Sequence, residues 1–408
     1  MYYVLSDDVY LVEGKAKSCL YDLKKSRLYS VNKALSDKIK LLNLGNLKEN
    51  DIDGELKNIL KKFIVLGLIE LSDKYRYNDI KQLKKENSEC DFAWIEVTNK
   101  CNLKCKHCYN ESNAYCEKVM SFEKFKETIE LLRNIGVKKI QLIGGEPFIN
   151  NHILRKMLDY VIGKFDYIEI FTNGTLIPEN YFEYFYRNNI HIALSVYSYK
   201  EDVHDKVTGI KGSWLRTNKT IKKLQKMSIP YRVCNVLMKD VEIGEKNNNL
   251  YTLSNEKDIV RMSGRANFSL LTDELIKKRL ITKKTFEKPI TKAFCRRIIS
   301  GHNCFCNKIY ISSDLEIFPC VMERRLKHGR IDSLASLKLN SQIRNLTKDN
   351  IKVCNYCEYR YACFDCRPDA LTNDVYKKPW YCTYDPDKGE WKKEEEFINE
   401  LKTTVKKL

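Results

Sequence analysis

The sequence lacks the segments that direct a chain into or across a membrane. No run of about 18 apolar residues occurs, which is the length that a spanning helix needs. The first residues, Met1 to Leu11, carry Asp7 and Asp8 in place of the cationic and apolar parts of a signal peptide. No repeat of fixed period is present, and 43% of the 408 residues are hydrophobic, which excludes a fibre or a disordered tail. We therefore expect a soluble, cytoplasmic protein of two or three domains.

Cysteine, by contrast, is abundant, with 16 residues. In a reducing cytosol these are poor candidates for disulfides, and their clustering at short spacings indicates metal or redox chemistry. The formal charge of +18 comes from lysines spread along the chain. Such a distribution is typical of a solvated surface, with nucleic acid or an acidic peptide as the alternative explanations.

The first part of the chain, residues 1–72, predicts a small α+β domain. Strand-like runs broken by polar turns precede two amphipathic helices, one capped by Asn32 and one beginning at Asp53, and a last short strand follows. Hairpin strands, two helices and a further strand make a winged-helix arrangement. Residues 73–90 are polar and predict a linker or an exposed helix.

Residues 91–284 alternate short apolar runs with amphipathic helices, which predicts a parallel sheet with crossover connections, either open or closed into a barrel. Residues 285–385 are rich in cysteine and poor in periodic elements, and residues 386–408 end in a charged helix expected from Trp391. The expected strands of the sheet are Phe92–Val97, Lys139–Ile143, Tyr167–Phe171, Ile192–Ser195, Tyr231–Met238 and Ile259–Met262.

The first cysteine cluster follows the first strand of this sheet. Cys101, Cys105 and Cys108 place three thiolates within eight residues, and thiolates favour zinc or iron–sulfur centres. A structural zinc would need a fourth ligand, for which Cys116 or His107 could serve. A 4Fe–4S cluster would instead have three protein ligands and leave one iron free to bind a substrate or cofactor.

Further polar or glycine-rich segments follow other strands, at the edge of the sheet where ligands gather in parallel folds. Each of them alone could be a simple turn or an exposed polar residue. In chain order they are Gly144-Gly145-Glu146-Pro147, Thr172-Asn173-Gly174, Ser195, and Arg261 with Gly264.

Together, the cysteine spacing and these strand-end segments resemble the signature of the radical S-adenosylmethionine (radical SAM) superfamily. The resemblance implies that three cysteines hold a 4Fe–4S cluster whose open iron binds the methionine part of S-adenosylmethionine. Its reductive cleavage, fed by an external donor such as flavodoxin or ferredoxin, gives a 5′-deoxyadenosyl radical. The resemblance also places cofactor contacts at His107 (adenine), Gly144, Gly145, Glu146 and Pro147 (amino group), Thr172, Asn173 and Ser195 (ribose or carboxylate), and Arg261 with Gly264 (adenosine).

The cysteines of the last third of the chain resemble the SPASM extension of radical SAM enzymes, which implies two auxiliary 4Fe–4S clusters. The outer cluster would be held by Cys354, Cys357, Cys363 and Cys382. The inner cluster would be held by Cys304, Cys320 and Cys366, and its fourth ligand is Cys295, Cys306 or absent. Two features depart from the family pattern: two residues rather than three precede Cys366, and Leu315 replaces the usual glycine before Cys320. Zinc ribbons are disfavoured because nine cysteines exceed the needs of two Zn(Cys)4 sites.

The three-part layout resembles maturases of ribosomally made, post-translationally modified peptides (RiPPs). By this resemblance residues 1–72 are a RiPP recognition element, which pairs an extended leader with a sheet edge, and the basic surface favours an acidic leader. The segments Cys320–Arg325 and Cys357–Cys363 resemble ranthipeptide maturases, which make sulfur-to-carbon thioethers from the cysteines of a Cys-rich precursor.

The expected architecture is therefore α/β: a partial (β/α)6 radical SAM barrel with an N-terminal winged helix and a C-terminal SPASM domain. Three 4Fe–4S clusters and S-adenosylmethionine are the expected cofactors, and neither nucleic acid nor a membrane is an expected partner. Four alternatives stay open: sulfatase-maturase-like oxidation of Cys or Ser to formylglycine, carbon–carbon cross-linking of a peptide, an RNA-modifying radical enzyme, although no RNA-binding module is evident, and a zinc-stapled, non-enzymatic peptide adaptor. The N-terminal domain could also be a merely structural cap.

Overall fold

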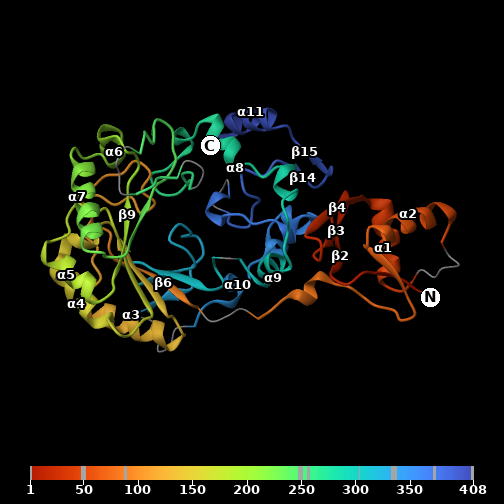
Figure 1. Ribbon diagram of the computed structural model, residues 1–408, viewed down its shortest axis with the longest axis horizontal. Helices are drawn as coiled ribbons and strands as arrows, with labels where there is room; N and C mark the ends of the chain where they lie inside the picture. The colour runs from red at the N-terminus through yellow and green to blue at the C-terminus, as the bar shows by residue number, and fades with distance from the viewer. Residues whose placement is uncertain are drawn as a thin grey trace. The chain divides into compact units, whose positions relative to one another are not determined.

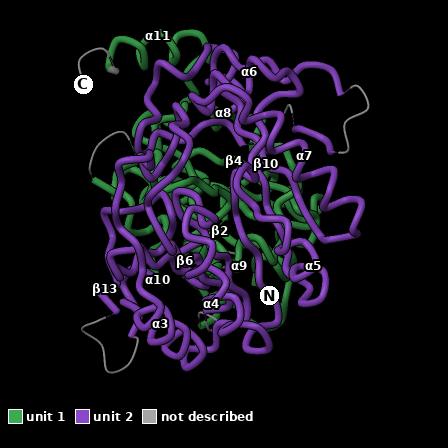
Figure 2. The backbone as a smooth tube through the Cα atoms, turned by 90° about the vertical axis from the view of Figure 1, so that its left-hand side faces the viewer, with its two compact units in different colours: residues 1–87, 280–303, 345–408 green, residues 88–279, 304–344 purple. Residues whose placement is uncertain are grey.

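The computed structural model describes residues 2–46, 52–86, 90–246, 251–254, 258–302, 304–331, 338–370 and 374–405. The backbone forms two compact units, which Figure 2 shows in different colours. The smaller unit combines residues 1–87, 280–303 and 345–408, and the larger one combines residues 88–279 and 304–344. The cysteine-rich stretch 285–385 is thus shared between the units, and the domain boundaries expected from the sequence remain a prediction.

The larger unit is built on a mixed sheet whose described strands lie in the order β10-β9-β8-β7-β6-β11-β12-β13. Neighbours from β10 to β11 are parallel, whereas β12 and β13 continue as an antiparallel meander. This confirms the expected α/β class with a parallel-rich sheet. The strands are β6 (Phe92–Thr98), β7 (Lys139–Gly144), β8 (Tyr167–Thr172), β9 (His191–Ser195), β10 (Tyr231–Cys234), β11 (Lys308–Ile311), β12 (Glu316–Phe318) and β13 (Gly329–Arg330).

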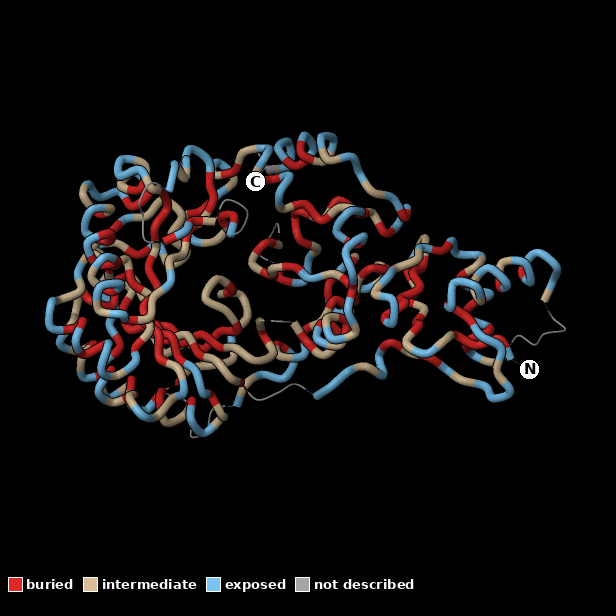
Figure 3. The backbone as a smooth tube through the Cα atoms, viewed as in Figure 1, coloured by how far each residue is buried: buried red, intermediate tan, exposed pale blue. Residues whose placement is uncertain are grey.

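Helices between the parallel strands cover one face of this sheet (Figure 1). Because side chains alternate along a strand, Ile95 of β6 and Leu142 of β7 enter the buried core under these helices. Glu96 and Gln141, one position along, belong to the opposite face, and Figure 3 shows the buried positions along the strands. The helices are α3 (Phe122–Asn134, capped by Ser121), α4 (Asn151–Val161), α5 (Asn180–Arg187), α6 (Glu201–Thr208) and α7 (Ser213–Lys226), followed outside this alternation by α8 (Asp273–Arg279) and α10 (Ser341–Arg344).

The sixth parallel strand differs from the expected one. The segment Ile259–Met262 contributes only an isolated parallel bridge between Ile259 and Leu237, and β10 ends at Cys234. The sixth parallel strand of the described sheet is instead β11, which pairs with β6 in the register Tyr310 to Trp94. It lies at the opposite side of the parallel strands from β10, the strand that Leu237 follows.

The N-terminal part of the smaller unit agrees with the expected strands and helices. An antiparallel meander of β2 (Val9–Glu13), β3 (Lys17–Asp22) and β4 (Arg27–Asn32) precedes α1 (Lys33–Asn43) and α2 (Gly54–Val65), and β1 (Tyr2–Leu5) pairs with β5 (Ile69–Ser72). Asn32 and Asp53 cap the helices by accepting hydrogen bonds from the N–H groups of Leu35 and Leu56. One face of the meander packs on these helices through Leu20 and Val31.

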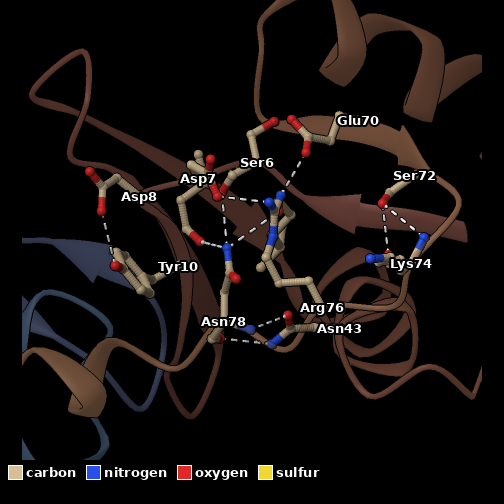
Figure 4. Close-up of polar contacts among 12 residues, drawn as sticks. Ser6, Asp7, Asp8, Tyr10, Asn43, Glu70, Ser72, Lys74, Arg76 and Asn78 are labelled. Carbon is tan, nitrogen blue, oxygen red and sulfur yellow. Dashed lines mark hydrogen bonds and ion pairs between the residues drawn. The ribbon is translucent and has the colours of Figure 1, made fainter.

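The segment after β5, expected to be a linker or an exposed helix, is instead bound to the N-terminal strands (Figure 4). The Arg76 guanidinium donates to the Asp7 carboxylate at 2.7 Å and to the Leu5 carbonyl at 2.6 Å. The Asn78 amide donates to the carbonyls of Ser6 and Val9, both at 2.9 Å. The polar residues of this segment therefore satisfy backbone acceptors, and a 3₁₀ helix, Ile80–Leu83, follows.

The remainder of the smaller unit contains α9 (Lys292–Ser300), β14 (Tyr384–Asp385), β15 (Glu390–Trp391) and α11 (Glu394–Val405), with short 3₁₀ turns at Cys354–Tyr356 and Arg360–Ala362. The last helix begins three residues after the expected Trp391, because Trp391 pairs in β15. In the parts of the chain that the structure describes, no helix combines the length and apolarity needed to span a bilayer.

Candidate active site and cysteine-lined cavity

The loop after β6 holds three of the predicted metal ligands together. Cys101 is buried, and Cys105 and Cys108 are half-buried. Burial, and then the Glu146 carboxylate, raise the pKa of Cys101, and the charges of Cys105 and Cys108 act in the same direction. Burial, followed by the charge of Cys108, raises the pKa of Cys105 to about 12. Thiols that influence each other in this way share a small space, as the sequence predicts.

Gly144 and Gly145, at the end of β7, pack directly against this loop. A Cβ on Gly145 would lie 2.1 Å from the Lys100 carbonyl oxygen, and one on Gly144 would lie 2.3 Å from that of Thr98. The N–H of Gly145 donates to the Thr98 carbonyl at 2.7 Å, and the N–H of Glu146 donates to the Lys100 carbonyl at 2.8 Å. The sequence predicts that the glycines allow a ligand to approach the backbone. In the structure they also allow the cysteine loop itself to approach.

Glu146 is fully buried and connects the ends of β7 and β8. Its carboxylate accepts hydrogen bonds from the Thr172 hydroxyl at 2.7 Å, the Asn173 N–H at 2.8 Å and the Phe148 N–H at 3.0 Å. Burial outweighs these bonds and raises the pKa of Glu146 to about 7. Pro147, also buried, starts the 3₁₀ helix that follows. Glu146 is thus positioned to fix the predicted cofactor contacts Thr172 and Asn173.

Asn173 contacts the cysteine loop through its side-chain amide. Its amide donates to Asn102 Oδ1 at 2.8 Å and lies 3.9 Å from Cys101 Sγ. Its own oxygen accepts from the hydroxyl of Thr175 at 2.7 Å. Asn102 was not predicted from the sequence, although its place between two ligands of the cysteine motif could have indicated it.

Tyr197, also not predicted, joins three candidate residues beyond β9. Its hydroxyl is hydrogen-bonded with the side chains of Ser195 and Cys105. The His107 ring meets the Tyr197 ring edge to face, with centroids 4.8 Å apart. Burial lowers the pKa of His107 to about 4, so this imidazole is neutral at physiological pH. A neutral, half-buried ring suits the predicted contact with an adenine.

The turn that begins at Arg261 packs against the cysteine loop. Gly264 has a φ of +60°, and a Cβ there would lie 2.4 Å from the Cys108 carbonyl oxygen. The N–H of Arg265 donates to that carbonyl at 3.1 Å, and its guanidinium donates to the Cys105 carbonyl at 2.9 Å. Arg265 was not predicted from the sequence, because it donates hydrogen bonds to backbone carbonyls that are far away in the chain.

In the smaller unit, the four cysteines predicted for the outer cluster line one cavity: Cys354, Cys357, Cys363 and Cys382. Burial raises the pKa of the first three thiols, and the charge of Cys382 acts on each of them in the same direction. The structure thus brings together a set that the sequence spreads over 29 positions, from 354 to 382.

The cysteines predicted for the inner cluster belong to different units. In the larger unit, Cys304 is close enough for its charge to raise the pKa of Cys320, after burial as the main cause. The Cys306 carbonyl accepts hydrogen bonds from the Arg344 guanidinium at 2.9 and 3.0 Å. In the smaller unit, the N–H of Cys366 donates to the Tyr381 hydroxyl at 2.9 Å, and Cys295 is buried. The inner ligand set stays a prediction.

Comparison with known families identifies the class of this site. Residues 95–242 match the family model described as the radical SAM superfamily. The chain therefore contains a radical SAM domain, which spans β6 to β10 and includes the cysteine loop. Members of this superfamily bind a 4Fe–4S cluster and S-adenosylmethionine, and the three thiols at the strand ends fit such a cluster.

Individual proteins are also similar to this chain in sequence or in fold. The chain is 40% identical, over 143 residues, to the antilisterial bacteriocin subtilosin biosynthesis protein AlbA of Bacillus subtilis. This match covers 35% of this chain and 32% of AlbA. The chain thus spans about a third of that relative. Its fold is similar to anSMEcpe with bound AdoMet (TM-score 0.53, 16% identity, 78% of this chain and all of that chain). It is also similar to Streptococcus suis SuiB (TM-score 0.52, 15% identity, 93% of this chain and all of that chain).

Proposed function

We propose that this chain is a cytoplasmic radical SAM maturase that forms sulfur-to-carbon thioether links in a ribosomally made, Cys-rich precursor peptide. The observation that carries the proposal is the pairing of two sulfur-lined sites in one chain. Cys101, Cys105 and Cys108 converge at the strand ends of a radical SAM domain, and four further cysteines line a cavity of the smaller unit. The relationship to AlbA, a bacteriocin biosynthesis protein, supports a peptide as the substrate.

At the first site the residues of this chain bind and orient. When bound there, a 4Fe–4S cluster and S-adenosylmethionine supply a 5′-deoxyadenosyl radical that abstracts hydrogen from the acceptor residue. Glu146 fixes Thr172 and Asn173 through its hydrogen bonds, and Tyr197 fixes Ser195. The neutral His107 would cover the adenine, with Arg261 along the adenosine. The buried Glu146, Thr172 and Tyr197 would help to keep water from the radical.

The second sulfur-lined site fits an auxiliary cluster, a potential acceptor of the electron that thioether formation releases. Four thiols lining one cavity supply the number of cysteine ligands that a 4Fe–4S cluster takes. A third cluster would use Cys304, Cys320 and Cys366, with Cys306 or Cys295 as the possible fourth ligand.

The N-terminal meander offers an edge for the leader peptide. Among the described strands, β4 pairs with β3 on one side and with no strand on the other. Arg27 and Asn32 of β4 are exposed, as are the nearby Lys24 and Lys25. A leader added as a further strand would satisfy the backbone groups of β4, and an acidic leader would suit the cations. Binding of a labelled leader, measured by fluorescence anisotropy, should weaken with added salt.

The test of the enzyme is anaerobic reconstitution followed by reaction with a Cys-rich precursor encoded next to this gene. The chain should bind about twelve irons in three clusters of four, accept electrons from flavodoxin or ferredoxin, and lower the peptide mass by two hydrogens per link. Cys105→Ala should abolish 5′-deoxyadenosine formation, whereas Cys116→Ala, on the same loop, should preserve it. Persistent deoxyadenosine in Cys105→Ala would refute the first site. Deoxyadenosine with an unlinked peptide would refute thioether formation, and a hydrazide-reactive peptide would indicate formylglycine instead.

A further inference from the structure

A buried lysine separates two cavities of the smaller unit. Lys348 is 5% exposed, and lysines are rarely so buried unless they are paired. It lines the cavity of the four cysteines, and it also lines a neighbouring cavity with His302 and Thr347. Cys363 lines both cavities as well. The ammonium group thus lies beside the sulfur-lined space.

Lys348 and a second buried cation share one carboxylate. Asp365, also buried, forms ion pairs with both Lys348 and Arg367. Arg367 is fully buried and also donates to the carbonyls of Val375 and Lys377, both at 2.9 Å. Asp369, a further buried carboxylate, lies two residues after Arg367 in the chain. Lys348 is thus a buried cation within a small group of buried charges.

Lys348 lines the sulfur-lined cavity together with Cys354 and Cys363, so a buried cation lies beside two of the proposed cluster ligands.

We infer that Lys348 is a positioning residue that holds positive charge against an iron–sulfur cluster bound by Cys354, Cys357, Cys363 and Cys382, and so favours its reduced state. This rests on the proposed function, which supplies the cluster. Reduction adds one electron and hence one negative charge, and a nearby cation stabilises the more negative form. Net charge, hydrogen bonds and exposure set the potentials of such clusters, and a buried cation acts more strongly than an exposed one. The charge makes this cluster the better acceptor of the electron released on thioether formation.

The experiment follows the reduction potential of this cluster in the reconstituted full chain, by redox titration with electron paramagnetic resonance. The relevant signal is the one that Cys363→Ala removes. Lys348→Met keeps an apolar stem of similar length and should move the potential to more negative values. Asp365→Asn removes the carboxylate charge that pairs with Lys348 and Arg367, and it should move the potential to more positive values. Lys352→Met is the matched control, because Lys352 lies on the same segment with its side chain 67% exposed and paired with Asp374, and it should cause no shift.

Three results would overturn the inference: an unchanged potential in Lys348→Met, a shift equal to that of Lys352→Met, or shifts of Lys348→Met and Asp365→Asn in the same direction. If Cys363→Ala removes a cluster signal that wild type shows, but Lys348→Met and Asp365→Asn do not shift its potential, the inference alone is overturned. If Cys363→Ala removes no cluster signal relative to wild type, the auxiliary cluster and the inference are overturned together.

Discussion

Replacing Glu146 by alanine should cost the larger unit several kcal/mol of unfolding free energy. The carboxylate is fully buried and accepts hydrogen bonds from Thr172, Asn173 and Phe148. Alanine leaves the two backbone N–H groups of Asn173 and Phe148 without an acceptor. Each buried donor that loses its partner costs about 1–3 kcal/mol, so two of them place the loss at roughly 2–6 kcal/mol.

A glutamine at this position separates hydrogen bonding from volume. Glu146→Gln fills the same space but has one acceptor oxygen where the carboxylate has two, and its amide N–H2 would face one of the donors. The expected loss is therefore that of one unsatisfied donor, about 1–3 kcal/mol. Glu127→Gln on the exposed side of α3 is the matched control. Glu127 forms an exposed ion pair with Lys124, at 2.8 Å, and such pairs contribute less than about 1 kcal/mol.

Urea denaturation of the metal-free full chain measures these differences without the contribution of bound clusters. The order of stability should be wild type and Glu127→Gln together, then Glu146→Gln, then Glu146→Ala. In the reconstituted chain, Glu146→Ala should also lower 5′-deoxyadenosine formation, because Thr172 and Asn173 lose their anchor. An unfolding midpoint of Glu146→Ala equal to that of Glu127→Gln would refute the positioning role of Glu146.

Three further outcomes are expected. Gly145→Ala should destabilise the chain by about 1–3 kcal/mol or more, because its Cβ would lie 2.1 Å from the Lys100 carbonyl oxygen. Gly54→Ala should not destabilise the chain, because a Cβ there meets nothing within 4 Å. Equal denaturation midpoints of the two variants would contradict this prediction. Burial raises the pKa of Glu146 to about 7, so its carboxyl binds a proton more tightly in the folded chain than in the unfolded chain. Wild-type stability therefore falls as pH rises from about 4.5 to about 7, and the loss of unfolding free energy in Glu146→Gln relative to wild type should shrink over this window. A constant loss across the pH series would contradict this prediction. Asn78→Ala should cost about 1–3 kcal/mol, because the two hydrogen bonds that its amide donates to the Ser6 and Val9 carbonyls are lost. Exposed Lys81→Ala should be neutral, and thermal unfolding that ranks the two variants otherwise would refute the anchoring of this segment.

Local pattern predicted those parts of the fold that local chemistry determines. The caps Asn32 and Asp53 start their helices because their side chains accept from N–H groups three residues on. The strands of the sheet alternate with amphipathic helices, so each strand is recognisable by itself. The pairing of β11 with β6 was not predictable in this way, since the two strands are far apart in the chain and no local pattern links them.

The same limit applies to the candidate site. The spacing of Cys101, Cys105 and Cys108 predicted a shared site because a short loop can bring its own members together. Tyr197 and Arg265 reach this loop from distant segments, through a hydrogen bond with the Cys105 side chain and one to its carbonyl. Such contacts have no signature in the spacing of residues, and only the folded sheet reveals them.

The smaller unit shows why the two ends of the chain belong together. The meander packs one face on α1 and α2, and its other face meets the outer cysteine segment. There the Tyr21 hydroxyl donates to the Glu358 carbonyl at 2.9 Å, and the Arg360 guanidinium donates to the carbonyls of both Glu13 and Cys357, at 2.6 and 2.9 Å. Both faces of the meander are thus covered, and among the described strands β2 and β4 each keep one edge without a partner strand; the proposed leader site is the edge of β4. A peptide bound at that edge would therefore be held by the element that also braces the Cys357 segment.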